Sequence, residues 1–189
     1  GSGKTTVAKA VVDRLIREGI SAAYFRDPGS SKTAEAIRSI LMNADYPMPG
    51  KVQALLFTAC RSMLADEIIA RPEQVIVLDR WLPSTIVYQG QQGVKAEDIM
   101  LMHERFVDDR VNMTLFLDVP VAVALARAAK RDGDRFDHAG LNVYHDRAAR
   151  YEAERRGHSA IDASKPLEDV VTAVYGRIVK SYSTVVWCR

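Results

Sequence analysis

Cysteines, long apolar runs and an excess of either charge are all lacking in this chain of 189 residues. Its two cysteines, Cys60 and Cys188, provide no disulfide framework and fit the reducing cytoplasm. No apolar run reaches the roughly 18 residues that a membrane-spanning helix requires. The net charge of +2 gives no reason to expect duplex nucleic acid or a membrane as a partner. We therefore expect a cytoplasmic protein that binds neither a membrane nor a nucleic acid polymer.

Length and composition are those of an ordinary globular protein. Hydrophobic residues make up 48% of the chain and charged residues 26%. Four histidines are scattered without metal-ligand spacing. A chain of this length can bury one substantial core, so we expect a single domain over residues 1–189.

The first six residues, Gly1-Ser2-Gly3-Lys4-Thr5-Thr6, match the second half of a phosphate-binding loop. In such a loop the backbone N–H groups surround a polyphosphate, Lys4 would reach the β and γ oxygens, and the Thr5 hydroxyl would hold Mg²⁺. A helix over about 7–18 would direct its N-terminus at the anion. An ordinary Gly-rich turn is the alternative. The first Gly of the full pattern and the strand before it would precede Gly1, so we expect both upstream of this sequence.

Segments with the patterns of strands and helices alternate along the chain. The predicted strands are 22–25, 74–79, 113–118 and 158–162, and further helices are predicted at 33–43, 51–70, 96–110, 120–131, 141–156 and 166–182. This order indicates a parallel sheet covered by helices on both faces. We expect the three-layer α/β/α fold of phosphate-loop nucleoside triphosphatases (NTPases), with five strands of which the first lies upstream, and a helical lid.

Charged residues follow the predicted strands, where parallel sheets bind ligands. Asp79 ends an apolar strand, as an acid holding Mg²⁺ beside a phosphate loop does, although it could merely cap the next segment. Arg80 follows it, and Arg26-Asp27 ends the neighbouring strand. Two guanidinium groups facing a phosphate loop suggest a second phosphorylated ligand. For Asp118 we favour helix capping.

The helix over 51–70 is expected to bury Val52, Leu55, Ala59 and Met63. Phe57 and Arg61, four residues apart, share another face. They could stack on a base and bond its carbonyl edge, although core packing remains an alternative for Phe57.

Two polar segments complete the candidate site. Residues 82–90 hold Ser84, Thr85, Tyr88 and Gln89, which either read a base and sugar or form a plain polar loop. Charge is dense over 127–156, and about 130–145 could form a mobile lid whose arginines stabilise a transferring phosphoryl group. A solvated charged face is the alternative.

Taken together, these motifs resemble the thymidylate kinases over nearly the whole chain. Arg26-Asp27-Pro28-Gly29 is similar to the family's R-E-P-G-G signature, and Leu56-Phe57 through Arg61 to its L-L-F-x-A-x-R helix. Asp79-Arg80 with 84–90 resembles the D-R-x-x-x-S-[ST]-x-A-Y-Q-G block, the most specific match. Ile161-Asp162-Ala163 is similar to the family's I-D-A strand.

The resemblance implies MgATP as donor, dTMP as acceptor and a homodimer. It implies that Phe57 stacks on thymine and Arg61 bonds its carbonyl edge. Arg26 and Arg80 would hold the monophosphate, and Tyr88 would favour deoxyribose. Because Ser2 stands where some members have a loop arginine, Arg131 or Arg135 would be the catalytic lid residue, and Arg127 would face adenine.

Several residues depart from the family's pattern. Asp27 replaces Glu, Ser30-Ser31 replaces Gly-Thr, and Trp81 replaces a smaller aromatic residue. The family's acidic residue near the sugar's 3′-hydroxyl would precede Gly1, and we expect activity to need it. A kinase for dUMP or a 5-modified dUMP, a deoxynucleoside kinase and, more distantly, a GTPase-type switch remain alternatives. Asp137-His138-Ala139-Gly140 fits the switch motif D-x-x-G, but no N-K-x-D for guanine exists.

Overall fold

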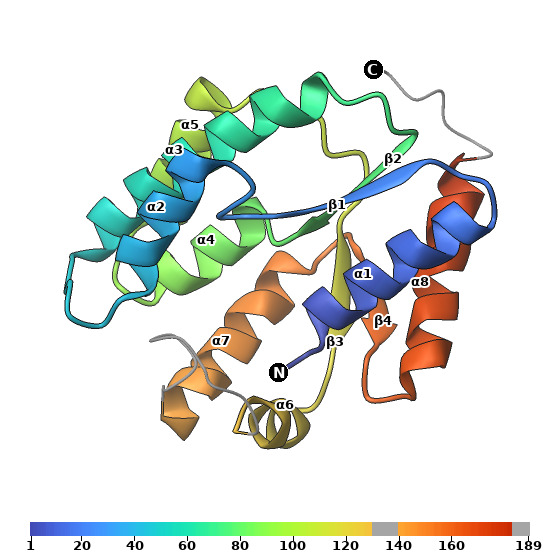
Figure 1. The fold of residues 1–189 in the computed structure, drawn as a ribbon. Helices are drawn as coiled ribbons and strands as arrows, with labels where there is room; N and C mark the ends of the chain where they lie inside the picture. Colours follow the sequence, from blue (N-terminus) through green and yellow to red (C-terminus); the bar gives the residue numbers. More distant parts are fainter. Residues whose placement is uncertain (130–139, 183–189) are drawn as a thin grey trace.

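The computed structural model describes residues 1–129 and 140–182, which form an α/β fold (Figure 1). The strands are β1 (Ala22–Arg26), β2 (Val75–Asp79), β3 (Leu115–Asp118) and β4 (Ser159–Asp162). The helices are α1 (Lys4–Arg17), α2 (Lys32–Met42), α3 (Gly50–Ile69), α4 (Leu82–Gly90), α5 (Ala96–Phe106), α6 (Val121–Ala128), α7 (Leu141–Glu154) and α8 (Leu167–Tyr182). No helix in these ranges is both long and apolar enough to cross a membrane.

The strands form two parallel pairs. β1 lies beside β2, with Ala22 opposite Val75 and Arg26 opposite Asp79. β3 lies beside β4, with Leu115 opposite Ser159. The predicted strands and their parallel direction are confirmed. The single sheet is not, because β2 and β3 are not hydrogen-bonded to each other within the described residues. The fifth strand, expected upstream of Gly1, stays a prediction.

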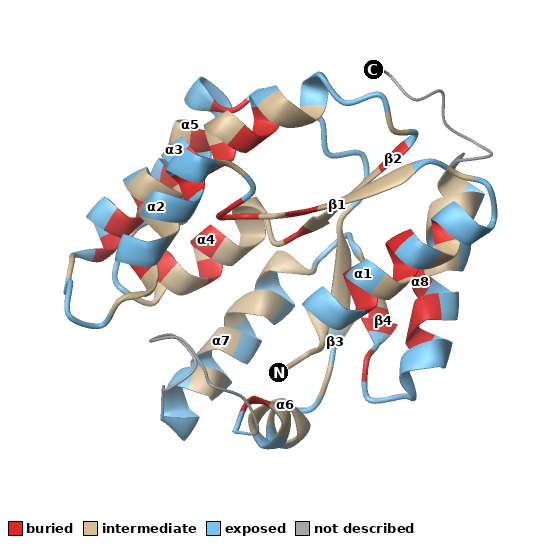
Figure 2. Ribbon diagram, viewed as in Figure 1, coloured by how far each residue is buried: buried red, intermediate tan, exposed pale blue. Residues whose placement is uncertain are grey.

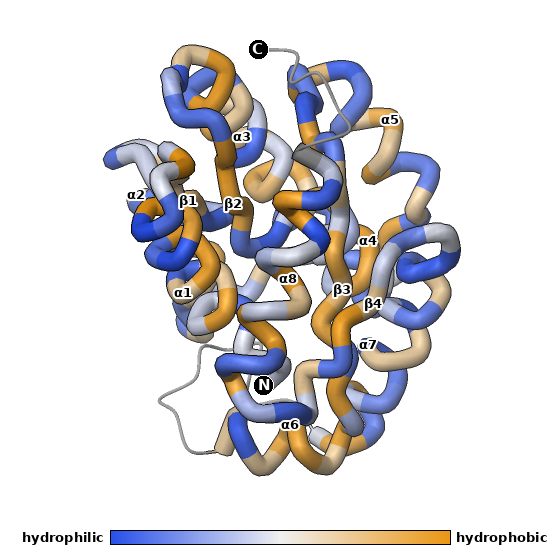
Figure 3. The backbone as a smooth tube through the Cα atoms, turned by 90° about the vertical axis from the view of Figure 1, so that its right-hand side faces the viewer, coloured by the Kyte–Doolittle hydropathy of each residue, from blue (hydrophilic) through white to orange (hydrophobic). Residues whose placement is uncertain are grey.

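The apolar core lies where α1 and α8 pack together over the strands, visible as buried stretches in Figure 2. On α1, Val7, Val11 and Leu15 recur every four residues and so share one face. Figure 3 shows β2 and β3 as largely hydrophobic stretches. We define the apolar core by its buried members, which are Val7, Val11, Leu15, Val75, Ile161, Val170, Val171 and Val174.

Helix α3 is turned differently from the prediction. Val52 and Leu55, expected in the core, are 36% and 55% exposed, Ala59 is exposed and Met63 is only half-buried. The buried face instead carries polar residues among small apolar ones, including Thr58 and Arg61. Arg61 must meet a counter-ion if it is to be buried, and that partner, Asp27, lies at the end of β1. The ion pair therefore turns the helix, and part of its apolar stripe faces outward.

The segment after β2 is helical rather than a loop. α4 follows Trp81 directly, and Pro83 stands in its first turn, where its missing N–H costs nothing. Val87 and Gln89 on this helix are fully buried, and α4 packs against α3, α5 and α7. α5 ends four residues earlier than predicted, and its last residue, Phe106, is 63% exposed.

Candidate functional site

The phosphate-loop residues lie at the start of α1. Gly3 has φ 82°, the left-handed conformation that glycine adopts most readily, and its carbonyl accepts the Val7 N–H at 2.9 Å. Lys4 Nζ donates to Ser2 Oγ at 3.3 Å, so the lysine folds back over the loop. Gly3 has no side chain that could cap the start of the helix, where N–H groups point toward a possible anion.

A hydroxyl–carboxylate cluster joins this loop to the end of β2. The Thr5 hydroxyl donates to Asp79 Oδ2, which also accepts from the Tyr24 hydroxyl at 3.3 Å. Asp79 is 5% exposed, and its Oδ1 is buried without a hydrogen-bond partner in the described part of the chain. Burial and the nearby Asp79 charge raise the pKa of Tyr24, so its hydroxyl stays a donor. The two predicted Mg²⁺ ligands, Thr5 and Asp79, are thus in contact.

The two predicted phosphate-binding arginines differ in their surroundings. Arg80 has φ 75°, a strained conformation for a non-glycine residue that is found mostly at functional sites. Its guanidinium lies 5.2 Å from the Tyr88 ring centroid and 3.5 Å from Ser84 Oγ. Arg26 instead donates to Glu35 Oε1 at 2.7 Å. Binding a phosphate would require Arg26 to leave Glu35, an ion pair that the sequence did not predict.

A buried polar cluster, defined as Asp27, Arg61 and Thr85, lies between β1, α3 and α4. Arg61 Nε and Nη2 each approach Asp27 Oδ2 at 2.7 Å, and Nη2 donates to Thr85 Oγ1 at 2.6 Å. All three residues are at most 3% exposed. Arg61 Nη1 and Asp27 Oδ1 are buried and find no partner among the described residues. An orphaned buried donor is costly, so it marks a position where a ligand acceptor would be stabilising.

The remaining predicted acceptor residues lie on or beside this cluster. Phe57 is half-buried on α3, one turn before Arg61. Gln89 is fully buried and donates to Gln53 Oε1 at 3.1 Å, so its amide braces α4 against α3. Asp27, predicted as a substrate ligand, is the counter-ion of Arg61.

The predicted donor-side residues are only partly described. Arg127 donates to the Ala163 carbonyl at 2.9 Å, which brings α6 to the end of the I-D-A segment. Arg131 and Arg135 lie outside the described residues, as does most of the predicted lid. Asp118 does not cap α6, because it approaches Arg155 at 3.7 Å and no side chain caps that helix.

Some residues around the site escaped sequence reasoning. Tyr151 of α7 donates to Ser84 Oγ at 3.3 Å, and burial raises its pKa to about 12. Tyr24 contacts Asp79, and Trp81 lies 5.5 Å from the Arg61 guanidinium. The positions of these residues depend on contacts between segments far apart in the sequence, so no local sequence pattern predicts their place in the site.

A glycine-started helix facing a strand-end carboxylate, with arginines at the same sheet edge, is the arrangement of a phosphate-loop nucleotide kinase. Comparison with known proteins narrows this class. The sequence model of the family Thymidylate kinase matches residues 1–174. The thymidylate kinase of Bradyrhizobium sp. (strain ORS 278) is 34% identical over 98% of this chain and 88% of its own length.

Two further relatives agree. The thymidylate kinase of Rhodopseudomonas palustris (strain TIE-1) is 35% identical over 93% of this chain and 83% of its own, and that of Ligilactobacillus salivarius (strain UCC118) is 30% identical over 90% and 89%. The chain belongs to the thymidylate kinase family. Its activity is the phosphorylation of dTMP to dTDP, as its motifs predicted.

Proposed function

We propose that this thymidylate kinase transfers the γ-phosphoryl group of MgATP to dTMP bound at the ends of β1 and β2. The observation that carries this proposal is the buried Arg61, whose Nη1 donor lacks a partner within the described residues. A thymine carbonyl would supply the acceptor that this N–H lacks, whereas the amino group of cytosine would not.

The acceptor site would use side chains from three elements. Phe57 would stack on the base, and Thr85, already bonded to Arg61, would add a hydroxyl at its edge. Arg80, with Arg26 released from Glu35, would hold the monophosphate. Tyr88 would lie against the sugar and favour deoxyribose. Gln89 would not contact dTMP directly but would hold α4 against α3.

The donor site would use the phosphate loop. Gly1, Ser2 and Gly3 would contribute backbone N–H groups, with Lys4 and Thr6 beside the phosphates of ATP. Thr5 and Asp79 suit Mg²⁺, because this ion prefers oxygen ligands and Asp79 Oδ1 is buried without a protein partner in the described ranges. When bound, Mg²⁺ would neutralise phosphate charge.

The chemistry would rest on positioning and charge. A dTMP phosphate oxygen is already anionic, so attack needs no side-chain base. Lys4 would stabilise the transferring group together with Arg131 or Arg135. These arginines would belong to a lid over about 130–145. The whole chain would form a single domain. Arg127 would face adenine.

We also propose that the protein is a homodimer. Helix α3 packs against both α2 and α5, and all three helices expose large apolar side chains. These side chains are Ile40, Val52, Leu55, Ile69, Met100, Leu101 and Phe106. Burying such a surface against a second copy removes apolar area from water. Light scattering at micromolar concentration should give twice the chain mass, and Leu55→Glu should shift the mass toward one chain.

A coupled ADP-release assay on the full chain tests the proposed reaction. We expect MgATP-dependent turnover of dTMP, loss of turnover when EDTA removes Mg²⁺, and little turnover of thymidine. dUMP and 5-substituted dUMP measure how strictly the base methyl is read. Equal or better turnover of thymidine would refute the proposed acceptor, because a nucleoside lacks the phosphate that Arg80 is proposed to hold.

A further inference from the structure

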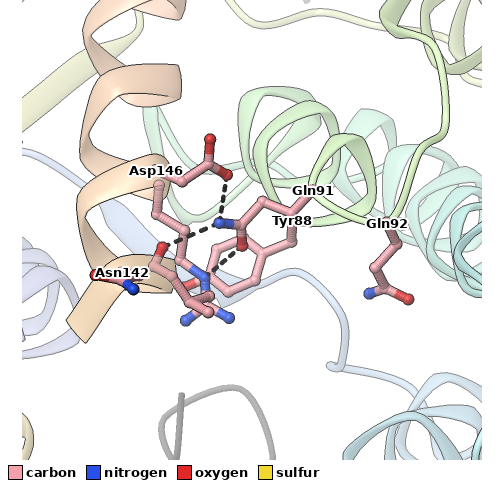
Figure 4. A pocket seen from close by; sticks show the side chains of 7 residues that line it. Tyr88, Gln91, Gln92, Asn142 and Asp146 are labelled. Carbon is pink, nitrogen blue, oxygen red and sulfur yellow. Dashed lines mark hydrogen bonds between the residues drawn. The ribbon is translucent and has the colours of Figure 1, made fainter. Parts of the chain in front are cut away.

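A glutamine just beyond the end of α4 is hydrogen-bonded to α7 through both the nitrogen and the oxygen of its side-chain amide. Gln91 Nε2 donates to the Val143 carbonyl at 3.0 Å and to Asp146 Oδ2 at 2.7 Å (Figure 4). Its Oε1 accepts from Arg147 Nε at 2.8 Å. One side chain therefore holds two neighbouring residues of α7 that carry opposite charges.

Only an amide satisfies this arrangement. The Asp146 carboxylate only accepts hydrogen bonds and the Arg147 guanidinium only donates them, so the bridging group must do both. A glutamate at position 91 would repel Asp146, and an apolar residue would bond neither neighbour. The same Asp146 Oδ2 also accepts from Arg150 Nε at 2.9 Å, so two donors hold this carboxylate oxygen in place.

Arg147 reaches from this bridge to the acceptor site. Its guanidinium carbon lies 4.5 Å from the centroid of the Tyr88 ring and 5.5 Å from that of Tyr144. Arg80 approaches the same Tyr88 ring at 5.2 Å, and Tyr151 meets it edge-on at 6.5 Å between centroids. Tyr88 is therefore packed against two guanidinium groups, one from the phosphate-binding residue Arg80 and one from α7.

The contact between α4 and α7 depends on these polar groups. α7 has no fully buried residue over its whole length, so hydrophobic burial does little to fix its position. A pocket of about 380 Å³ lies along the junction, lined by Tyr88, Gln91, Asn142, Asp146 and Arg147 among others. The Tyr88 ring borders this open space, and Arg147 and Tyr151 contact the ring from α7.

We infer that Gln91 and Arg147 are positioning residues for the acceptor site. Gln91 orients the Arg147 guanidinium, and Arg147 holds the Tyr88 ring in the orientation that receives the sugar of dTMP. This inference rests on the proposed function, since it gives Tyr88 its place beside the nucleotide.

Substitutions at the two positions test the inference. In the full chain, Arg147→Met should raise KM for dTMP about fivefold to thirtyfold, the range expected for losing a partly desolvated cation–π contact. Its kcat should change less than about twofold, and KM for ATP should stay the same, because only acceptor binding is affected. Arg147→Lys should not restore the wild-type KM, because lysine lacks both the planar face and the Nε donor.

Gln91→Met should raise KM for dTMP in the same direction by about threefold, the size of one lost hydrogen bond. Added to Arg147→Met it should have no further effect, because Gln91 acts through Arg147. Gln91→Glu should also fail to restore the wild-type KM. Arg155→Met is the matched control, since Arg155 lies at the end of the same helix and pairs with Glu152. It should leave both KM values unchanged.

Calorimetric titration of dTMP without ATP should reproduce the KM changes as changes in Kd, and urea unfolding should show every variant folded. A KM for dTMP within twofold of wild type in Arg147→Met would overturn the inference, as would full additivity of the two substitutions. A failure of the proposed function is distinct, because the unmodified enzyme would then not use dTMP at all.

Discussion

The apolar core and the buried polar cluster are both closed to water, but they are built from opposite materials. In the apolar core, valines, a leucine and an isoleucine from α1, α8, β2 and β4 exclude water and need no partners. In the polar cluster, Arg61 and Asp27 are buried as ions. Removing an ion from water costs several kcal/mol, so such a pair is weak evidence for stability. We infer from this difference that the apolar core stabilises the fold and that the polar cluster binds the ligand.

The largest effect is expected from removing one ion of the buried pair. Arg61→Met should lower the free energy of unfolding by about 3–5 kcal/mol, because Asp27 is left buried without a counter-ion. Urea denaturation measures the loss. The double variant Asp27→Leu with Arg61→Met should regain most of the stability and none of the dTMP kinase activity. Recovery of activity in the double variant would contradict a role for the cluster in binding.

A matching truncation in the apolar core should act on stability alone. Leu15 is completely buried, so Leu15→Ala should cost about 2–5 kcal/mol through lost burial and the cavity left behind. For the protein that remains folded, KM for dTMP should not change. A raised KM at unchanged stability would mean that the two regions are not separate in function.

Phe57 is expected to affect ligand binding rather than stability. Because it is half-buried on the face that holds Arg61, Phe57→Ala should mainly remove stacking on the base. We expect KM for dTMP to rise about tenfold, within the range for base–aromatic stacking, and unfolding to change by less than about 1 kcal/mol. Steady-state kinetics and urea unfolding on the same sample test this outcome. If Phe57 mainly packs in the core, the free energy of unfolding should fall and KM for dTMP should change little.

The smallest effect is expected at Asp109, the carboxylate that pairs with His103 after α5. Partial burial raises the pKa of Asp109, but the His103 and Val111 N–H hydrogen bonds outweigh it and hold this pKa below its usual value. A lowered folded-state pKa adds stability above the unfolded pKa, and this stability is lost as pH falls through the folded value. Asp109→Asn should therefore cost about 1 kcal/mol or less near neutral pH. Urea unfolding should show the difference vanishing at acidic pH, and a difference that persists there would exclude this origin.

The sequence predicted the four strands to within about two residues, because each is a short apolar run with polar ends. It also placed Lys4, Thr5, Asp79 and Arg80 at one edge, since the carboxyl ends of parallel strands meet there. It was wrong about the buried face of α3. Apolar spacing alone favoured Val52 and Leu55, and nothing local indicates that Arg61 finds Asp27 across 34 positions of the chain.

The pairing of charges around the site was also beyond sequence reasoning. Arg26 with Glu35, and Gln91 with Asp146 and Arg147, depend on how separate helices and loops meet. Charged residues of this kind read equally well as a solvated surface until their partners are known. The helix α4 was missed for a related reason, because its Ser, Thr and Gln residues have the composition of a loop while its buried face reads Thr85, Val87 and Gln89.

The central claim is that the buried Arg61 reads a base carbonyl, and the kcat/KM values for dTMP and dCMP with MgATP test it most directly. The two nucleotides differ at the base edge, where cytosine carries an amino group that cannot accept a hydrogen bond from Arg61 Nη1. The account predicts that dTMP is preferred by about a hundredfold or more, since a buried donor left facing a donor is strongly unfavourable. Similar kcat/KM values for the two substrates would contradict it.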